Sequence, residues 1–281
     1  RLIRDADEIY LIDKASGSWL FRFDGTEIVP YYKRFNLINK VYLDHDNNLW
    51  IGTEAGLWRL ITMGFRQYLS DPDENFYTWM VMRPKSGDYI FASYKYGLNR
   101  FDEKDFTPIP GYEDMAFYSG GIRDADGNVI LGTSEGIIRY DGKEMHWLYH
   151  EKRRIVPFMY DDYHHDQYLV SINTLGVAEM DRSMKIKFIY SDREPYQHTE
   201  LVTSILRDRF DRIWICGKKG ICIREHDTWR ELPDSRDSIP IGAIAMLKDH
   251  VGNIWLGGND GLYHYDYKHL RQVASHIFDQ Q

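Results

Sequence analysis

Short apolar runs separated by turn residues occur along the whole chain. In the segment 36–75, the runs 41–43, 49–51, 57–60 and 65–69 are rich in aromatic and branched residues and are parted by Asp, Asn and Gly. Runs of this length and composition are typical of β-strands. We therefore predict four strands in this segment, named A to D in chain order and joined by tight turns.

The same pattern recurs with a period of about 40 residues. Clear copies begin at Asp44 (Asp-His-Asp-Asn-Asn-Leu-Trp-Ile-Gly), Asp124 (Asp-Ala-Asp-Gly-Asn-Val-Ile-Leu-Gly) and Asp249 (Asp-His-Val-Gly-Asn-Ile-Trp-Leu-Gly). A further copy, the sixth in chain order, begins at Asp208 and has Cys216 in the first glycine position. Three degenerate copies complete the series. One bulky apolar position can be followed through all of them: Tyr10, Trp50, Ile90, Ile130, Leu169, Trp214 and Trp255.

Seven such units predict an all-β fold, a seven-bladed β-propeller with four antiparallel strands per blade. We expect one domain over residues 1–281, with blades near 1–35, 36–75, 76–115, 116–152, 153–197, 198–238 and 239–281. The large apolar position is expected to pack blade against blade at Trp50, Trp214 and Trp255. The glycine that opens strand C suits a tight turn with positive φ.

Composition narrows the class of protein. The 281 residues are 43% hydrophobic and 28% charged, which excludes a disordered or collagen-like chain. Lys and Arg number 35 against 43 Asp and Glu, a net charge of -8, and no basic run is present, so no nucleic-acid partner is expected. No long apolar run occurs, and the chain starts at Arg1 without a Met. We expect it to be a piece of a longer protein.

Two cysteines, Cys216 and Cys222, are too few for a disulfide scaffold or a four-ligand zinc site. They are either a cross-strand pair or two buried thiols. Both occupy apolar positions of the repeat, which favours buried thiols.

The block Asp-x-x-Gly-Asn-Ile-Trp-Leu-Gly-x-x-x-Gly-Leu-x-x-Tyr resembles the regulator-propeller repeat (two-component regulator propeller) of Bacteroidetes-type hybrid two-component histidine kinases. It is best seen around Trp50, Ile130, Trp214 and Trp255. Such receptors typically carry two seven-bladed propellers, a β-sandwich domain, one membrane span and cytoplasmic kinase and receiver domains. The resemblance implies a periplasmic, non-catalytic sensor of oligosaccharides from complex carbohydrate breakdown. Its partners would be a second propeller and a membrane-proximal domain of the parent chain, with a homodimer as a further possibility.

Two groups of residues have side chains that could act as metal ligands. The repeated Asp-x-Asp-Gly/Asn-Asn has oxygen ligands at alternate positions, as Ca²⁺ requires, but the copies at Asp208 and Asp249 lose the middle Asp. A turn-capping role, in which the Asp side chain accepts backbone N–H bonds, explains all copies. His164-His165-Asp166, with Asp161-Asp162 upstream, falls in a hairpin where adjacent histidines point to opposite faces. We favour a solvated turn there and predict neither metal nor cofactor.

No phosphate-binding loop and no nucleophile elbow is present, and we assign no catalytic residue. Acid pairs for glycoside chemistry depend on a separation that the sequence does not give. A propeller hydrolase or lyase acting on a glycan remains an alternative, as does a protein-interaction scaffold.

Ligand recognition is expected on the face of the B–C and D–A loops, because the A–B turns on the other face are uniform. Tyrosines interleaved with basic residues in these loops suit a sugar bearing acidic groups. The candidate binding residues are Tyr32, Arg34, Tyr94, Lys95, Tyr96, Arg153, Arg154, Lys218, Lys219, Asn259 and Asp260.

Three arginines recur at one position of strand C, three residues after its opening glycine: Arg59, Arg100 and Arg139. Because they repeat from blade to blade, we expect them to form inter-blade salt bridges and exclude them from the ligand site.

Overall fold

The computed structural model of the chain describes residues 2–5, 8–13, 19–23, 28–33, 35, 37–44, 46, 48–61, 64–68, 78–85, 87–93, 97–112, 115, 117–150, 159–162, 165–172, 176–183, 185–190, 202–217, 220–226, 228–232, 245–258 and 261–275. The secondary-structure elements of these residues are β-strands. None of these residues belongs to a helix long and apolar enough to cross a membrane.

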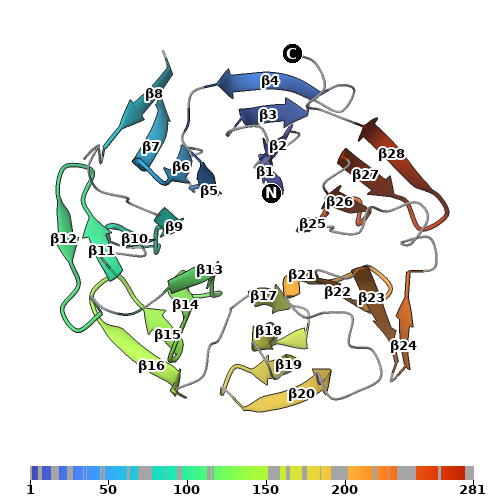
Figure 1. Ribbon diagram of the computed structural model, residues 1–281. Helices are drawn as coiled ribbons and strands as arrows, with labels where there is room; N and C mark the ends of the chain where they lie inside the picture. The colour runs from blue at the N-terminus through green and yellow to red at the C-terminus, as the bar shows by residue number, and fades with distance from the viewer. Residues whose placement is uncertain are drawn as a thin grey trace. The chain divides into compact units, whose positions relative to one another are not determined.

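Within the described residues the strands form seven four-stranded sheets, each following chain order (Figure 1). The first three sheets consist of β1 (Leu2–Asp5), β2 (Glu8–Asp13), β3 (Trp19–Phe23) and β4 (Ile28–Lys33); β5 (Ile38–Leu43), β6 (Leu49–Thr53), β7 (Gly56–Ile61) and β8 (Gly64–Gln67); and β9 (Thr78–Met82), β10 (Tyr89–Ser93), β11 (Gly97–Phe101) and β12 (Phe106–Pro108).

The other four sheets repeat this arrangement. They consist of β13 (Phe117–Arg123), β14 (Val129–Thr133), β15 (Gly136–Tyr140) and β16 (Met145–His150); β17 (Met159–Asp162), β18 (Gln167–Ile172), β19 (Gly176–Asp181) and β20 (Ile186–Tyr190); β21 (Val202–Arg207), β22 (Ile213–Gly217), β23 (Gly220–Glu225) and β24 (Thr228–Glu231); and β25 (Ala245–Lys248), β26 (Ile254–Gly258), β27 (Gly261–Tyr265) and β28 (Leu270–Ser275).

The strands pair antiparallel, as in β6 with β7 and β22 with β23. The four runs expected in the segment 36–75 correspond to β5–β8, so the strand prediction is confirmed there.

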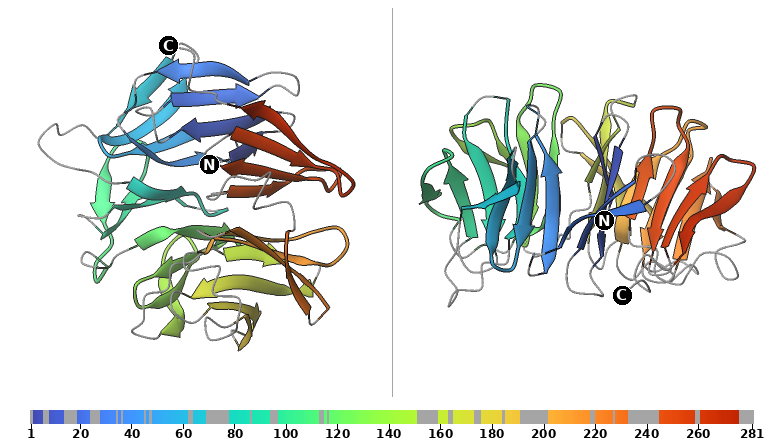
Figure 2. Two further views of the ribbon diagram at one scale, coloured as in Figure 1. Left: turned by 45° about the vertical axis from the view of Figure 1, so that its right-hand side comes forward. Right: turned by 90° about the horizontal axis from the view of Figure 1, so that it is seen from above.

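The chain divides into two compact units. One comprises Arg1–Leu2, Thr26–Ile28 and Phe158–Gln281, and the other comprises Ile3–Gly25 and Val29–Pro157. Within each unit neighbouring sheets meet through their first strands, as β5, β9 and β13 do in one and β17, β21 and β25 in the other. Figure 2 shows the strands in two further views.

The glycine that opens the third strand has positive φ in six sheets, as predicted. Its φ ranges from 58° at Gly97 to 146° at Gly136, a region that residues with a Cβ rarely occupy. The repeat therefore conserves this glycine for the tight turn between the second and third strands. The six residues are Gly56, Gly97, Gly136, Gly176, Gly220 and Gly261.

Large aromatic side chains fill the space between sheets of one unit. Trp50 is fully buried and lies 4.6 Å from the ring of Tyr89 in the next sheet. Trp214 is equally buried and packs against Ile254 and Leu256 of its neighbour. The predicted blade-to-blade packing is thus confirmed for these two tryptophans. Trp255 is only partly buried and contacts His264 of its own sheet, with ring centroids 4.5 Å apart.

Basic side chains at the ends of the first strands link neighbouring sheets in a way that the sequence analysis missed. Arg123, which ends β13, donates from Nη2 to the carbonyl oxygen of Arg83 at 2.5 Å. Lys248, which ends β25, donates from Nζ to the carbonyl oxygen of Arg207 at 2.9 Å. The sequence signal was a Lys or Arg directly before the hairpin Asp. The partner of this side chain is a backbone carbonyl about one repeat earlier, so the same kind of hydrogen bond joins neighbouring sheets in both units.

The arginines of the third strand were only partly predicted. Arg59 reaches the neighbouring sheet, where its Nη1 lies 2.8 Å from Glu103 Oε2. Arg100 and Arg139 instead pair within their own sheets, with Asp88 at 3.4 Å and with Asp124 at 3.4 Å. The inter-blade prediction was wrong for these two. The reason is that the hairpin of the same sheet already offers a carboxylate within reach of the side chain.

The two cysteines are buried thiols that form no disulfide, as predicted. They lie on opposite faces of their sheet. Cys216 packs into the core toward β25–β28, and Cys222 packs into the core toward β17–β20. Burial raises the pKa of Cys216 to about 12. A thiol is reactive as the thiolate, so the native protein should not expose a reactive sulfur.

We expect neither thiol to react with a water-soluble aromatic disulfide at pH 8 in the folded chain. In concentrated guanidinium chloride both should react within minutes. Absorbance of the released thiolate measures the count. Rapid labelling of one thiol in the native state would contradict the burial described for its sheet face.

Candidate functional site

The ligand-binding residues predicted from the loops lie outside the described residues. Ten of the eleven, Arg34, Tyr94, Lys95, Tyr96, Arg153, Arg154, Lys218, Lys219, Asn259 and Asp260, belong to segments that the structure does not describe. Of Tyr32 the backbone alone is described, at the end of β4. This group of residues stays a prediction.

The hairpin between the first and second strands has the capping geometry that was predicted. Asp44 Oδ1 accepts hydrogen bonds from the backbone N–H groups of Asp46 at 2.9 Å and Asn48 at 2.8 Å. Asp208 and Asp249 bind the backbone of their hairpins in the same way. The turn-capping interpretation of the repeated Asp is therefore confirmed.

The second carboxylate oxygen explains why Asp and Trp stand six residues apart. Trp50 Nε1 donates to Asp44 Oδ2 at 2.9 Å, and Trp214 Nε1 donates to Asp208 Oδ2 at 2.7 Å. The hairpin places Asp44 beside Asn48, and Trp50 lies two residues farther along the strand, on the same face. One side chain thus closes the turn and anchors the core tryptophan.

Asp44 is held ionised by its partners. Burial by itself would raise its pKa, but hydrogen bonds from the Tyr89 hydroxyl, the Asn48 N–H and the Trp50 indole outweigh burial and lower the pKa. For Tyr89, burial and the adjacent Asp44 carboxylate raise the pKa. Since Tyr89 belongs to the next sheet, this hydrogen bond also links two sheets.

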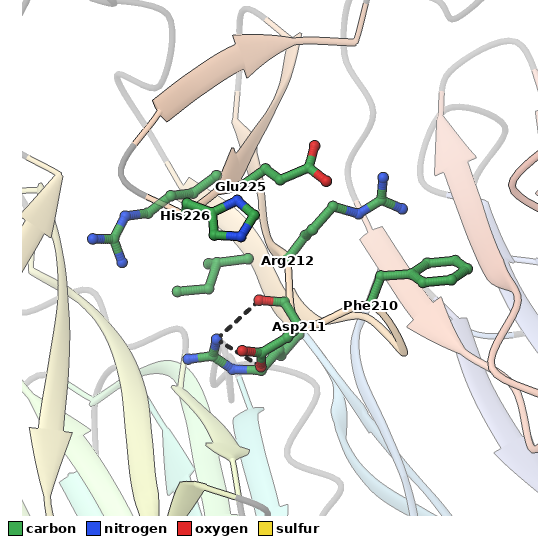
Figure 3. A pocket seen from close by; sticks show the side chains of 8 residues that line it. Phe210, Asp211, Arg212, Glu225 and His226 are labelled. Carbon is green, nitrogen blue, oxygen red and sulfur yellow. Dashed lines mark hydrogen bonds and ion pairs between the residues drawn. The ribbon is translucent and has the colours of Figure 1, made fainter.

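A hollow of about 310 Å³ opens at the turn end of the sheet β21–β24 (Figure 3). Arg207 ends β21, the β21–β22 hairpin supplies three further residues, and β22, β23 and the turn after β23 supply the rest. Figure 3 shows His226 between Glu225 and Arg212, while the ring of Phe210 points away from it. The lining residues are Arg207, Phe210, Asp211, Arg212, Ile213, Arg224, Glu225 and His226.

Each arginine of the hollow lies beside a carboxylate. Arg207 donates from Nη1 to Asp211 Oδ1 at 3.2 Å and from Nη2 to Glu179 Oε1 at 3.4 Å. Arg224 Nη1 lies 3.9 Å from the same Glu179 oxygen, and Arg212 Nε donates to Asp208 Oδ2 at 2.8 Å. Glu179 belongs to β19, so the preceding sheet of the same unit contributes to this network.

The carboxylates of the lining are paired as well. Asp211 Oδ1 lies 2.8 Å from His165 Nε2, and Glu225 Oε2 lies 3.7 Å from Arg230 Nε. His165 was predicted to lie in a solvated turn, and it is exposed, with Asp211 of the next hairpin as its partner. The described residues contain no group of three or more His, Cys, Asp or Glu arranged to hold a metal ion.

The sequence analysis missed this hollow because it treated the hairpins as uniform. The signal was present in the sixth copy. Arg212 stands where the other clear copies have Asn48, Asn128 and Asn253, and its Nε replaces the Asn amide as donor to the capping carboxylate. The exchange keeps the hairpin closed and adds a longer, charged side chain to the lining of the hollow.

Apolar side chains are exposed at the tips of two neighbouring hairpins. Phe210 is 55% and Val251 is 54% exposed, at the position where the copies at Asp44 and Asp124 have Asp46 and Asp126. The Phe210 ring meets Tyr267 edge to face with centroids 4.9 Å apart. In these two hairpins an apolar residue therefore replaces the Asp that the other two copies have at this position.

Comparison with solved structures shows the class of fold. The extracellular domain of the putative hybrid two component system BT3049 from B. thetaiotaomicron is 15% identical over 96% of this chain and 45% of its own, with a TM-score of 0.54. The corresponding domain of BT4673 is 15% identical over 95% and 39%, with a TM-score of 0.52. Virginiamycin B lyase from Staphylococcus aureus is 13% identical over 92% and 90%, with a TM-score of 0.68.

At these identities the likeness concerns the fold, and it shows an all-β propeller with four-stranded antiparallel blades. The chain spans less than half of the length of the two receptor domains. Residues 33–55, which contain the Asp44 hairpin and Trp50, match the family described as two component regulator propeller. The resemblance drawn from the repeat is thus confirmed. No curated protein matches the sequence significantly.

Proposed function

We propose that this chain is a non-catalytic ligand-sensing propeller from the extracytoplasmic, periplasmic part of a hybrid two-component receptor. The observation that carries the proposal is the regulator-propeller match at residues 33–55, on a chain whose fold resembles the extracellular domains of two such systems. A sensing role requires a ligand that binds one arrangement of the receptor better than another. We further propose that this ligand is an oligosaccharide from complex carbohydrate breakdown.

The finer architecture belongs to the same proposal. The seven sheets would close as one seven-bladed ring and one domain over residues 1–281, with the blade ranges given above. Loop residues including Tyr94, Tyr96, Lys218 and Lys219 would contact the oligosaccharide. A second propeller and a membrane-proximal domain of the parent chain, and a homodimeric partner, would carry the signal onward.

A lyase is the second candidate, because the virginiamycin B lyase matches over 90% of its own length with a TM-score of 0.68. Propellers support many unrelated activities, so the fold does not separate the two functions. Turnover does. A lyase or hydrolase would convert its ligand, whereas a sensor domain would release it unchanged.

The test is calorimetric titration of the 281-residue chain with a panel of neutral and acidic oligosaccharides, with chromatography of each mixture after prolonged incubation. Binding without new products would support the sensor proposal, and products would support the enzyme. Loss of binding in a Tyr94→Ala, Tyr96→Ala double variant would support the loop site. The absence of both binding and products across the panel would contradict both functions and favour a protein-interaction scaffold.

A further inference from the structure

We propose that the hollow at the turn end of β21–β24 binds a neutral sugar unit. This inference rests on the proposed function and deepens it, because it names the chemical class of ligand and a second place of contact. The hollow lies at the end of the sheet that carries the β21–β22 and β23–β24 hairpins. It is built from described residues of one compact unit.

The first argument is charge balance. The three arginines of the lining each lie within 4 Å of a carboxylate, from Asp208, Asp211 or Glu179. The two lining carboxylates are paired in turn with Arg207, His165 and Arg230. An anionic group entering the hollow would have to compete with Asp211 and Glu179 for Arg207. The lining therefore offers no surplus of positive charge for an acidic sugar.

The second argument is the hydrogen-bonding inventory. A sugar hydroxyl donates one hydrogen bond and accepts up to two, so adjacent hydroxyls are best met by donors and acceptors placed side by side. Arg207 and Arg224 bring guanidinium groups, which carry N–H donors, to the lining. Asp211 and Glu225 offer oxygens with further lone pairs, and both are open to solvent. Side chains that place donors and acceptors next to one another can therefore hydrogen-bond the neutral hydroxyl groups of a sugar.

The third argument is shape. The exposed imidazole of His226 stands among the lining side chains (Figure 3). The C–H groups of a sugar ring can pack against such surfaces. A volume of about 310 Å³ is at the low end for small-molecule pockets, which suits one or two sugar rings rather than a long oligosaccharide.

The position of His226 allows a clean variant. Its backbone has a φ of 57°, where glycine is permitted, so His226→Gly removes the imidazole without adding backbone strain. Arg224→Gln removes one guanidinium and keeps most of the stem. Glu103 is the control: it has a φ of 73° in the equivalent turn of another sheet and does not line the hollow, and Glu103→Gly removes one exposed turn side chain together with its ion pair to Arg59.

The experiment is calorimetric or NMR titration of the 281-residue chain with neutral mono- and disaccharides and with the corresponding uronic acids. We expect a neutral sugar to bind with a Kd on the order of millimolar. Binding should weaken at least fivefold in His226→Gly and tenfold in Arg224→Gln and remain unchanged in Glu103→Gly. Because the ligand is uncharged, the Kd should be the same at about 50 mM and about 500 mM NaCl.

Different failures separate the two proposals. If neutral sugars bind equally well to the wild type and both hollow variants, the hollow is not their site, while the sensor proposal stands. If only uronic acids bind, with an affinity that falls with salt, the neutral-ligand inference is overturned and an acidic oligosaccharide sensor remains. If no mono- or disaccharide and no uronic acid binds, the inference is overturned, and the oligosaccharide panel described under the proposed function decides that proposal separately.

Discussion

Replacing Gly136 by alanine is expected to lower the free energy of unfolding by about 3 kcal/mol or more. Gly136 opens β15 with a φ of 146°, which residues with a Cβ rarely adopt. A Cβ at this position would also overlap the carbonyl oxygen of Tyr149 on β16 and approach His150 Cα at 3.0 Å. Both contacts are with backbone, so a rotamer change cannot relieve them.

The control is Gly111→Ala, which separates the overlap from the backbone conformation. Gly111 also has positive φ, 85°, but a Cβ there would meet no atom within 4 Å. Its replacement should cost about 1 kcal/mol. Urea unfolding followed by circular dichroism gives both values. An equal loss in the two variants would show that the contact with β16 relaxes and that the turn conformation alone carries the cost.

Replacing Asp208 by asparagine is the second large effect, about 3 kcal/mol or more. The Asp208 side chain is buried and accepts hydrogen bonds from the Phe210 and Arg212 backbone, from Arg212 Nε and from Trp214 Nε1. Asparagine keeps one acceptor oxygen but presents an amide N–H₂ to two donors. The Arg212 guanidinium would lose its carboxylate in a site where its side chain is 12% exposed.

Asp249→Asn is the matched control for this prediction. Asp249 caps the equivalent hairpin and binds the Trp255 indole at 3.0 Å, but the hairpin residue beside it is Asn253 instead of an arginine. We expect a loss of about 1 to 2 kcal/mol, from the indole and turn hydrogen bonds without a buried cation. If Asp249→Asn destabilises the chain as much as Asp208→Asn, the ion pair with Arg212 is not the source of the larger loss.

The candidate site shows what the sequence pattern could and could not reveal. The departures of the sixth copy, Phe210 and Arg212, are visible in the alignment of the repeats. Their consequence is not, because Glu179 comes from the preceding sheet, 28 residues before Arg207. Which charges meet across two sheets depends on how long side chains reach over the space between them. The repeat period does not contain that information.

The sequence by itself determined the elements that depend on short-range chemistry. Alternating apolar runs predicted the strands, glycine marked the turns with positive φ, and Asp six residues before Trp marked a capped hairpin. Each of these follows from backbone sterics or from hydrogen bonds within one hairpin. The same logic placed Cys216 and Cys222 in the interior, because apolar positions of a strand face a core.

Tertiary structure decided the partners of the charged side chains. Arg59 pairs with the next sheet, whereas Arg100 and Arg139 at the same repeat position pair with their own hairpins. The three arginines share one local sequence position, so only the carboxylates around each of them differ. The hollow beside Arg207 has the same origin. A long flexible side chain binds the nearest carboxylate in space, and the packing of neighbouring sheets determines which carboxylate that is.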